Sequence, residues 1–318
     1  MKITVLDAAT FGDDIDLSLF RAVGDLRVIG MTAPHEIAKN CEGADVIILN
    51  KIKINRNTLP PPTTVKLVCV AATGVDNIDV DYCREQGIAV CNVRGYSTDS
   101  VAQVTVAMAL SLICHLPSYN RFIASGEYSA TRFPNHLEPY YHELTGMTWG
   151  VVGYGNIAKR VATVAEALGC RVLVYSRTPA PDRENADIDE LCRRSDILSV
   201  HVPLNDGTRN LIDRRRISLM KPSAILVNVA RGAVTEEQAL ADAIAEERLG
   251  GLGVDVFSTE PMPADHPFSA IADRENVCLT PHMAWGAHEA RVRCMREIAD
   301  NIKSFAEGGT RNRVDLCS

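Results

Sequence analysis

The chain of 318 residues has no surplus of basic residues, because 33 Lys and Arg stand against 40 Asp and Glu and the formal net charge is −7. Proteins that bind nucleic acid in general need such a surplus to neutralise the phosphate backbone. The composition therefore predicts no nucleic-acid partner. A local basic pocket for one small anion remains compatible with it.

Segments that direct a chain to a membrane or out of the cell are also lacking. The N-terminus reaches Asp7 without the apolar stretch of roughly 7–15 residues that a secretory signal contains. No apolar run approaches the roughly 20 residues that span a bilayer. The ten cysteines form no Cys-x-x-Cys pair and lie in apolar runs, as buried thiols of a reducing compartment do. We expect a cytoplasmic protein with no membrane contact, no disulfide framework and no metal site.

Short apolar, β-branched runs alternate with helical patterns along the chain, and hydrophobic residues make up 46% of it, enough for two buried cores. Continuous apolar strands separated by helices are typical of parallel sheets covered on both faces. Strands are expected at Ile3–Leu6, Val46–Leu49, Leu67–Val70, Trp149–Val152, Val172–Tyr175, Ile197–Val202, Ile225–Val229, Gly253–Val256 and Val277–Leu279.

Two long helical patterns cover about Thr98–His115 and His288–Glu307. The first begins at Ser97, Thr98 or Asp99, each of which is a suitable N-cap. The strands before and after it look like separate sheets. The sequence therefore predicts a domain boundary near residue 98.

A glycine-rich loop, Gly153–Ala158, follows an expected strand and opens a helical pattern. Its spacing is Gly-x-Gly-x-x-Ala. The first glycine permits a tight turn, and the second lets the backbone approach a pyrophosphate at the helix N-terminus. The strand–loop–helix setting predicts a dinucleotide site.

The acid that usually binds the ribose hydroxyls of such a dinucleotide is missing. At its position, after the next strand, stand Ser176, Arg177 and Thr178. The hydroxyls can still bind the ribose, and the guanidinium suits a 2′-phosphate. Alternatively, Arg177 stacks on the adenine or points to solvent. The coenzyme is therefore NAD or NADP, with NADP modestly favoured.

Three later segments each place a charged residue after an expected strand: Arg231, Glu260 and His282. Taken singly, they could be a surface pair, a loop charge and a strand-end histidine. Ligands of open parallel sheets bind beyond the carboxyl ends of strands. There, a guanidinium can hold a 2-oxo acid, an imidazole can protonate the developing alkoxide, and a carboxylate can orient the imidazole.

These segments resemble the D-isomer-specific 2-hydroxyacid dehydrogenase family over nearly the whole chain. Thr73–Asp79, Tyr96–Gln103 and His201–Leu204 carry the resemblance further, in the family's order. It implies an α/β fold of two doubly wound parallel-sheet domains, with the coenzyme in the cleft between them. Residues 1–97 and 288–318 would form a flavodoxin-like catalytic (substrate) domain, and residues 98–287 a Rossmann NAD(P)-binding domain. Members are usually homodimers built around the long helices of the cofactor domain.

The resemblance also implies roles for single residues. Arg231 resembles the substrate-binding arginine, His282 the acid/base and Glu260 its carboxylate partner. Cofactor contacts are expected at Thr73, Gly153, Gly155, Asn156, Ile157, Ser176, Arg177, Thr178, His201, Pro203, Val229, Ala230, Arg231, Asp255 and His282. Substrate contacts are expected at Asn50, Lys51, Thr73, Gly74, Val75, Arg231, His282 and Trp285. Backbone N–H groups of the turn at 73–75 would hold the substrate carboxylate.

Within the family, Tyr96–Gln103, Pro281–Trp285 and Leu49–Lys51 look most like glycerate dehydrogenases, which reduce hydroxypyruvate. We therefore expect an oxidoreductase that interconverts a 2-oxo acid and a D-2-hydroxy acid by hydride transfer. The expected pair is hydroxypyruvate and D-glycerate, or glyoxylate and glycolate.

Two other functions remain open. A 3-phosphoglycerate dehydrogenase needs further cations for the substrate phosphate, and Lys51 and Arg94 are candidates. The C-terminal-binding-protein corepressors use the same fold to hold partner peptides, so a non-catalytic nucleotide-sensing binder is an alternative from another class. The sequence lacks the basic run of a nuclear protein, and this argues against the corepressor-like alternative.

Overall fold

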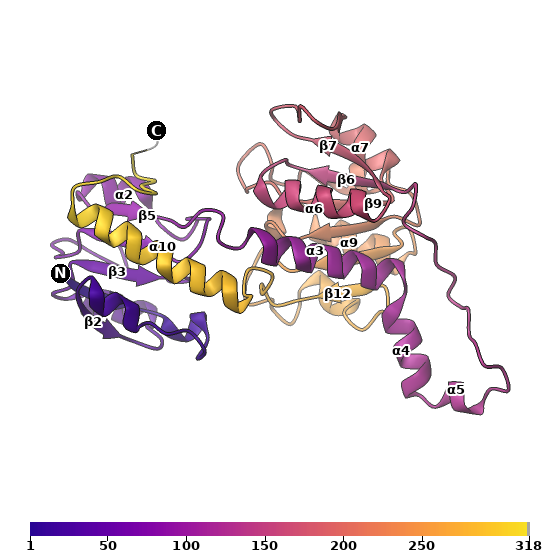
Figure 1. The fold of residues 1–318 in the computed structure, drawn as a ribbon, viewed down its shortest axis with the longest axis horizontal. Coiled ribbons are helices and arrows are strands. Elements are labelled where there is room, and N and C mark those ends of the chain that lie inside the picture. Colours follow the sequence, from indigo (N-terminus) through magenta and orange to yellow (C-terminus); the bar gives the residue numbers. More distant parts are fainter. Residues whose placement is uncertain (317–318) are drawn as a thin grey trace. The chain divides into compact units, whose positions relative to one another are not determined.

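The computed structural model describes residues 1–316, so Cys317 lies outside the described part of the chain. These residues form two compact units (Figure 1). The first unit joins Met1–Ser97 to the segment that begins at Gly286, and the second is Thr98–Trp285. Each unit contains one parallel sheet, so the predicted α/β fold class is confirmed.

The sheet of the first unit has five parallel strands in the order β2-β1-β3-β4-β5. Its strands are β1 (Lys2–Val5), β2 (Asp25–Val28), β3 (Val46–Leu49), β4 (Leu67–Val70) and β5 (Ala89–Cys91). Its helices are η1 (Ala8–Phe11), η2 (Ser18–Ala22), η3 (Pro34–Glu36), α1 (Ile37–Cys41), α2 (Val80–Glu85) and α10 (His288–Ala306). The C-terminal helix α10 packs on β4, which places the end of the chain on the N-terminal sheet.

The second unit has a seven-stranded parallel sheet in the order β12-β11-β10-β9-β6-β7-β8. Its strands are β6 (Thr148–Val152), β7 (Arg171–Tyr175), β8 (Glu184–Asn185), β9 (Ile197–Val200), β10 (Ile225–Asn228), β11 (Gly251–Val254) and β12 (Val277–Leu279). The strand order reverses between β6 and β9: β7 and β8 follow on one side of β6, whereas β9 to β12 follow on the other. In open α/β sheets, ligands bind at the carboxyl ends of the strands beside such a reversal.

Helices cover both faces of this second sheet, and α3 packs against α6, β10 and β11 (Figure 1). The helices are α3 (Thr98–Ile113), α4 (Leu116–Ala124), α5 (Glu127–Ala130), α6 (Asn156–Ala167), α7 (Ile188–Arg194), α8 (Arg214–Ile217), η4 (Gly232–Val234), α9 (Glu237–Ala245) and η5 (Pro267–Ala270). Buried apolar side chains fill both faces of the sheet, as the continuous apolar strands predicted.

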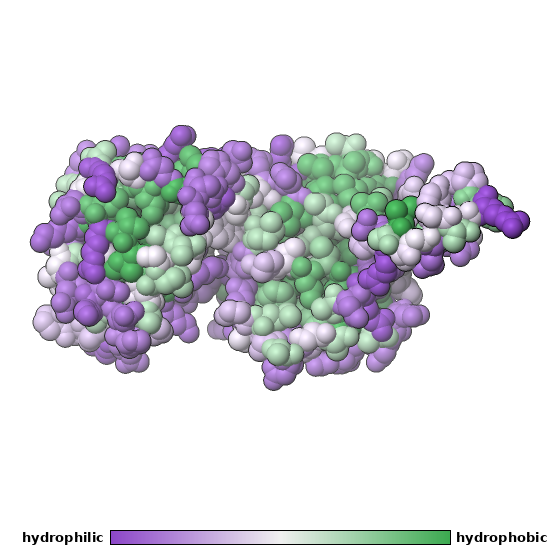
Figure 2. All heavy atoms as spheres, turned by 90° about the horizontal axis from the view of Figure 1, so that it is seen from below, coloured by the Kyte–Doolittle hydropathy of each residue, from purple (hydrophilic) through white to green (hydrophobic). Residues whose placement is uncertain are grey.

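Residues 116–141, which we call the arm, extend from the body of the second unit and include α4 and α5 (Figure 1). Six of the eleven exposed large hydrophobic residues of the described chain lie in the arm: Leu116, Ile123, Phe133, Leu137, Tyr140 and Tyr141. Apolar atoms are also exposed on the second unit next to the arm (Figure 2). Within residues 1–316, no single helix is long and apolar enough to cross a bilayer, and α3 with α4 would pass only as a pair bent by 61°.

The sequence missed three strands, each at or near a sheet edge. Strand β2 has the exposed pattern of an edge strand, whereas β5 and β8 are only three and two residues long. Strands β2 and β8 lack the continuous apolar run by which buried strands were found, and β5 is apolar and buried but very short. The long helix expected to reach His115 ends at Ile113, because His115 adopts a left-handed conformation and α4 starts in a new direction.

Candidate active site

Charged side chains follow three adjacent strands at the carboxyl edge of the second sheet. Arg231 follows β10, Glu260 follows β11 and His282 follows β12. Neighbouring parallel strands end at the same edge of a sheet, so the loops that carry these residues lie side by side. The sequence predicted this convergence from the strand ends alone.

The imidazole of His282 is paired with the carboxylate of Glu260. His282 Nδ1 lies 2.6 Å from Glu260 Oε2, and the two side chains are 24% and 31% exposed. Glu260 Oε1 accepts a hydrogen bond from the Phe257 N–H at 3.1 Å, which fixes the carboxylate on its own turn. With Nδ1–H donating to the carboxylate, Nε2 is the ring nitrogen left to exchange a proton with a ligand.

A buried carboxylate, Asp255, holds the turn that presents His282. Its oxygens accept hydrogen bonds from Thr280 Oγ1 at 2.5 Å, Met283 N at 2.9 Å and Ala284 N at 3.0 Å. His282 itself has a left-handed backbone with φ of 52°, a conformation that costs free energy in a non-glycine residue. The hydrogen bonds to Asp255 stabilise this turn. The coenzyme contact predicted for Asp255 stays a prediction.

Asn228, the last residue of β10, builds the turn that carries Arg231. Its side chain is fully buried; its amide donates to the Arg231 carbonyl at 3.0 Å, and its carbonyl accepts from Ala230 N at 3.0 Å. Arg231 is half-buried and donates from Nη1 to the Ala230 carbonyl at 2.7 Å. The sequence analysis gave Asn228 no role, although a polar residue at the end of an apolar strand was a usable signal.

The glycine-rich loop fits a dinucleotide. Gly153 has φ of 91°, and a Cβ there would lie 2.9 Å from Val202 Cγ1 and 3.0 Å from the His201 carbonyl oxygen. A Cβ at Gly155 would meet nothing within 4 Å. Among residues 1–316, no side chain caps the N-terminus of α6, so its first N–H groups face the open side of the loop. An uncapped helix N-terminus behind a close-fitting glycine turn is suited to a pyrophosphate.

His201 adds a second feature that fits a ligand beside this loop. His201 Nε2 lies 3.0 Å from Ser199 Oγ, which accepts from Trp149 Nε1 at 3.0 Å and donates to the Gly150 carbonyl at 3.5 Å. His201 Nδ1 is a buried atom with no hydrogen-bond partner within the described chain. Burial lowers the pKa of His201 to about 3, so its ring is neutral at physiological pH. A buried polar atom without a partner favours a bound ligand that meets it.

The remaining predicted cofactor residues of the second unit, and the predicted substrate residue Trp285, follow the carboxyl ends of its strands. Ser176 is half-buried with its hydroxyl donating to the Thr178 carbonyl, whereas Arg177 and Thr178 are exposed after β7. Asn156 and Pro203 are exposed; Ile157, Val229, Ala230 and Trp285 are half-buried. Trp285 Nε1 donates to the His282 carbonyl at 2.8 Å. Within the described chain, no group of three or more His, Cys, Asp or Glu side chains has the arrangement of a metal site.

In the first unit, a buried acid organises the segment predicted to bind substrate. Asp7 accepts hydrogen bonds from Asn50 N at 3.0 Å and Lys51 N at 2.7 Å. Asn50 is buried and its amide nitrogen donates to Thr10 Oγ1 at 3.1 Å, whereas Lys51 is exposed. Desolvation raises the pKa of Asp7, and the backbone donors oppose that rise. The sequence analysis did not single out Asp7.

The turn at Thr73–Val75 follows β4 in the same unit. Thr73 is tied to the neighbouring loop, because its hydroxyl donates to the Val93 carbonyl at 2.8 Å and its carbonyl accepts from Asn92 Nδ2 at 2.7 Å. The N–H groups of Gly74 and Val75 donate to no acceptor within residues 1–316. Two adjacent free donors on a fixed turn are suited to a carboxylate.

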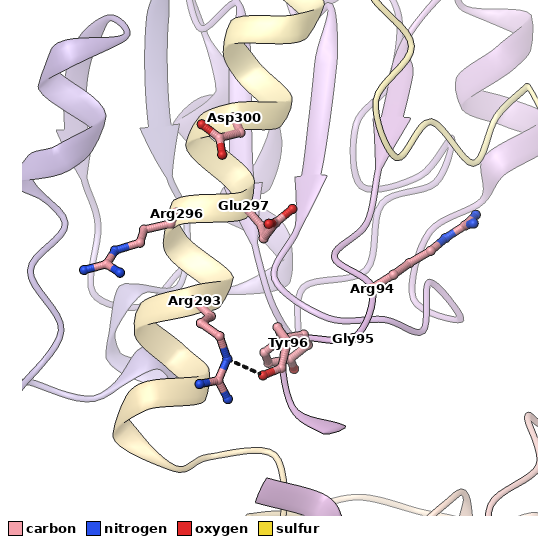
Figure 3. A pocket seen from close by; sticks show the side chains of 7 residues that line it. All are labelled: Arg94, Gly95, Tyr96, Arg293, Arg296, Glu297 and Asp300. Atoms are coloured by element: carbon pink, nitrogen blue, oxygen red, sulfur yellow. Dashed lines mark hydrogen bonds between the residues drawn. The ribbon is translucent and has the colours of Figure 1, made fainter. Parts of the chain in front are cut away.

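A separate open pocket of the first unit lies between α10 and the loop after β5 (Figure 3). It is lined by Arg94, Gly95, Tyr96, Arg293, Arg296, Glu297 and Asp300. Arg293 Nε donates to the Tyr96 carbonyl at 3.1 Å, and the side chain of Arg94 extends away from the α10 side chains. The lining contains both arginines and acids, so the pocket shows no single-sign field.

Comparison with known proteins agrees with this fold. The family model for the D-isomer specific 2-hydroxyacid dehydrogenase, NAD binding domain, matches residues 106–284. The chain belongs to this family, as the resemblance predicted. It is therefore an oxidoreductase of the D-2-hydroxyacid dehydrogenase type with a nicotinamide dinucleotide cofactor.

The similar proteins are named after several different substrates. The chain is 34% identical over 282 residues to a glycerate dehydrogenase of Methylorubrum extorquens, and the matched region covers 89% of each of the two chains. It is 32% identical to a hydroxypyruvate reductase of Blautia hydrogenotrophica, covering 99% of this chain and 100% of the relative. The solved D-lactate dehydrogenase of Aquifex aeolicus, complexed with NAD and lactic acid, matches all of both chains with 28% identity and a TM-score of 0.86.

Proposed function

We propose that this protein is a glycerate dehydrogenase that reduces hydroxypyruvate, with glyoxylate as a poorer substrate. The observation that carries the proposal is the 2.6 Å pair between His282 Nδ1 and Glu260 Oε2, with Arg231 at the end of the next strand but one. This combination of an acid, its carboxylate partner and a forked cation is suited to a 2-oxo acid. The names of the two relatives support the choice of hydroxypyruvate.

The side chains of the second unit have distinct roles in this proposal. Arg231 binds the carboxylate and carbonyl oxygens of the 2-oxo acid through its planar fork. The bound nicotinamide supplies the hydride that reduces the carbonyl carbon. His282 donates the Nε2 proton to the carbonyl oxygen, and Glu260 stabilises the imidazolium before that transfer. In the reverse direction, neutral His282 accepts the hydroxyl proton.

Residues of the first unit, the substrate domain of this proposal, provide mainly backbone donors. The N–H groups of Gly74 and Val75 hold the substrate carboxylate, and Thr73 keeps their turn in place through its bond to Val93. Exposed Lys51 and the Asn50 segment, which Asp7 holds, meet the 3-hydroxyl of hydroxypyruvate. Trp285 contacts the substrate from the second unit.

For the coenzyme, the proposal is that NADPH is modestly preferred and NADH remains usable. The supporting feature is exposed Arg177 where a ribose-binding acid would repel a 2′-phosphate. The pyrophosphate would lie on Gly153, Gly155, Asn156 and Ile157, while His201 Nδ1, which has no partner within the described chain, would face the coenzyme. The other coenzyme contacts are proposed at Thr73, Ser176, Thr178, Pro203, Val229, Ala230, Arg231, Asp255 and His282.

We further propose that two copies of the chain associate through the arm. Its exposed Phe133 and Leu137, 72% and 63% accessible, have no cover within residues 1–316, and exposed apolar clusters of this kind mark association surfaces. Sedimentation velocity tests this assembly, with Phe133→Glu expected to yield a monomer. The nine free cysteines of the described chain support a reducing compartment, the cytoplasm.

The experiment that tests the activity is a turnover panel with the purified full-length protein. Hydroxypyruvate, glyoxylate, pyruvate and 3-phosphohydroxypyruvate are each assayed with NADH and NADPH. Hydroxypyruvate should give the highest kcat/KM. Preference for the phosphorylated acid would favour a phosphoglycerate dehydrogenase, for which Lys51 and the pocket residue Arg94 are the candidate phosphate-binding cations. Absence of turnover with every acid would favour a nucleotide-sensing binder.

A further inference from the structure

Behind the Glu260 turn lies a hydrogen-bonded network that the proposed chemistry does not use. It consists of Glu237, the first residue of α9, together with Ser258 and His266. The side chains of Glu237 and His266 are only 10% and 4% exposed. A carboxylate and an imidazole this well buried carry a desolvation cost, which calls for a structural or functional reason.

The orientation and tautomer of the His266 ring follow from its partners. His266 Nδ1 accepts a hydrogen bond from the Phe268 N–H at 3.2 Å. The ring proton is therefore on Nε2, which donates to Glu237 Oε2 at 3.1 Å. Phe257 meets the ring edge-on, with centroids 5.7 Å apart, so the imidazole is also fixed by packing.

Glu237 in turn holds the peptide segment that ends in Glu260. Its Oε1 accepts from Ser258 N at 2.8 Å, and its Oε2 accepts from Ser258 Oγ. On the other side of the same segment, Phe257 N donates to Glu260 Oε1, whose other oxygen meets His282. Hydrogen bonds on the two sides of the Phe257–Ser258 backbone therefore link His266 and Glu237 to the Glu260–His282 pair.

The same network contacts the turn of Arg231. A Cβ on Gly232, the next residue, would overlap the Phe257 carbonyl carbon and Ser258 N, and would lie 2.7 Å from Glu237 Oε1. The two turns thus touch backbone to backbone, and Glu237 fills the corner between them. A shift of Glu237 would change the spacing between Arg231 and Glu260.

We propose that Glu237 and His266 are positioning residues that hold the 257–260 segment so that Glu260 faces His282 and Arg231 keeps its place beside it. This inference rests on the proposed function of that pair. Neither residue touches substrate or coenzyme in the proposal. Their effect on turnover is transmitted through Glu260.

Glu237→Gln is the first test, since an amide cannot accept from both Ser258 and His266 without turning its NH2 group toward one donor. We expect kcat/KM for hydroxypyruvate to fall by about ten- to a hundredfold, the range that displacement of a catalytic group produces. Glu260→Gln removes the carboxylate beside the imidazolium and should move the upper limb of the pH–rate profile to lower pH. Glu237→Gln should move the same limb in the same direction. Coenzyme Kd should not change.

The matched control is Glu236→Gln, which removes the neighbouring carboxylate from the same helix start. Glu236 accepts from Arg214 N at 2.8 Å and has no contact with Ser258 or His266. It should leave the pH profile unchanged. An equal loss of activity in both variants would assign the effect to the helix terminus and overturn the inference.

Two substitutions of His266 distinguish its bond to Glu237 from its bond to the Phe268 N–H, because glutamine and asparagine each replace one ring nitrogen. His266→Gln keeps a donor toward Glu237 and should retain most of the activity. His266→Asn keeps an acceptor for the Phe268 N–H but loses the donor, so it should reproduce the Glu237→Gln kinetics. The opposite ranking would show that His266 only caps η5. This pair remains informative if Glu237→Gln does not fold.

A double variant and a spectroscopic readout complete the design. If Glu237 acts through Glu260, Glu237→Gln should add no further pH shift in a Glu260→Gln background; additive shifts would contradict it. The His282 ring titration, followed by NMR, should move to lower pH in Glu237→Gln without any substrate present. Inactive wild type would therefore defeat the proposed function, whereas an unmoved titration would defeat the positioning role.

Discussion

In both units, a buried aspartate within two residues of a strand end holds a neighbouring loop. Asp7 accepts N–H groups of Asn50 and Lys51 in the first unit, and Asp255 accepts those of Met283 and Ala284 in the second. The loops differ in what they present. The loop at Asp255 carries an imidazole already paired with a carboxylate, whereas the loop at Asp7 uses its buried amide internally. The second unit therefore provides reactive side chains, and the first mainly provides fixed backbone.

This comparison predicts where substitutions stop turnover. His282→Gln should lower kcat by roughly 10²–10⁴, the loss expected for a general acid, while coenzyme Kd and the melting temperature stay near those of the wild type. Kinetic assays measure turnover, a fluorescence titration measures the Kd of NADPH, and thermal unfolding measures the melting temperature. Near-normal turnover would remove His282 from the mechanism and make the second unit no more reactive than the first.

Arg231→Lys tests whether the geometry or the charge of the side chain after β10 matters for substrate binding. The ammonium keeps the charge but cannot form two parallel hydrogen bonds, and one lost charge-assisted bond costs about 1.5–3 kcal/mol. We expect kcat/KM to fall by about ten- to a hundredfold for every 2-oxo acid in the panel. A defect confined to coenzyme KM would assign Arg231 to the cofactor instead.

Arg177→Ala examines the adenosine end of the same sheet edge. A charge-assisted contact to the 2′-phosphate is worth about 1.5–3 kcal/mol, so NADPH should bind about ten- to a hundredfold more weakly while NADH is nearly unaffected. Isothermal titration with both coenzymes measures this. Equal weakening of both would make Arg177 an adenine-stacking residue, and a wild type that ignores NADPH would refute the preference.

Residues with reactive side chains could be predicted from the sequence, whereas residues that hold the backbone could not. Arg231, Glu260 and His282 stand out as charges after apolar strands, and the glycine loop has a fixed spacing. Asp7, Asn228 and Glu237 did not stand out, because their function depends on which backbone groups meet their oxygens in three dimensions. Edge strand β2 was missed for a related reason: its exposed face breaks the apolar run.

A smaller effect is expected in stability. His201 is neutral in the folded protein, since burial lowers its pKa to about 3, but an unfolded histidine titrates near 6.5. Its stability contribution is therefore complete above pH 6.5 and lost as the pH falls toward 3. Relative to His201→Gln, the wild type should lose about 1.4 kcal/mol of unfolding free energy per pH unit below about pH 6.

Urea unfolding of both proteins between pH 7 and pH 4.5 measures this slope. His35→Gln, at an exposed position, is the matched control and should follow the wild type. Parallel curves for wild type and His201→Gln would show that the ring gains a proton partner in the folded state. The unpartnered Nδ1 would then lose its significance for coenzyme binding.

The smallest expected effect is at Asp7, and its sign is opposite. Because desolvation raises the pKa of Asp7 above 3.8 despite the N–H groups of Asn50 and Lys51, ionisation is less favourable in the folded state. Stability from this group is present below pH 3.8 and lost as the pH rises through the raised pKa. Asp7→Asn resembles the protonated acid, so the unfolding free energy of this variant should gain on the wild type as the pH rises. Asp45→Asn is the control with the reverse slope, because the Lys66 ammonium lowers the pKa of Asp45. If Asp7→Asn instead falls behind with rising pH, the backbone hydrogen bonds outweigh burial, and Asp7 holds its loop chiefly as an anion.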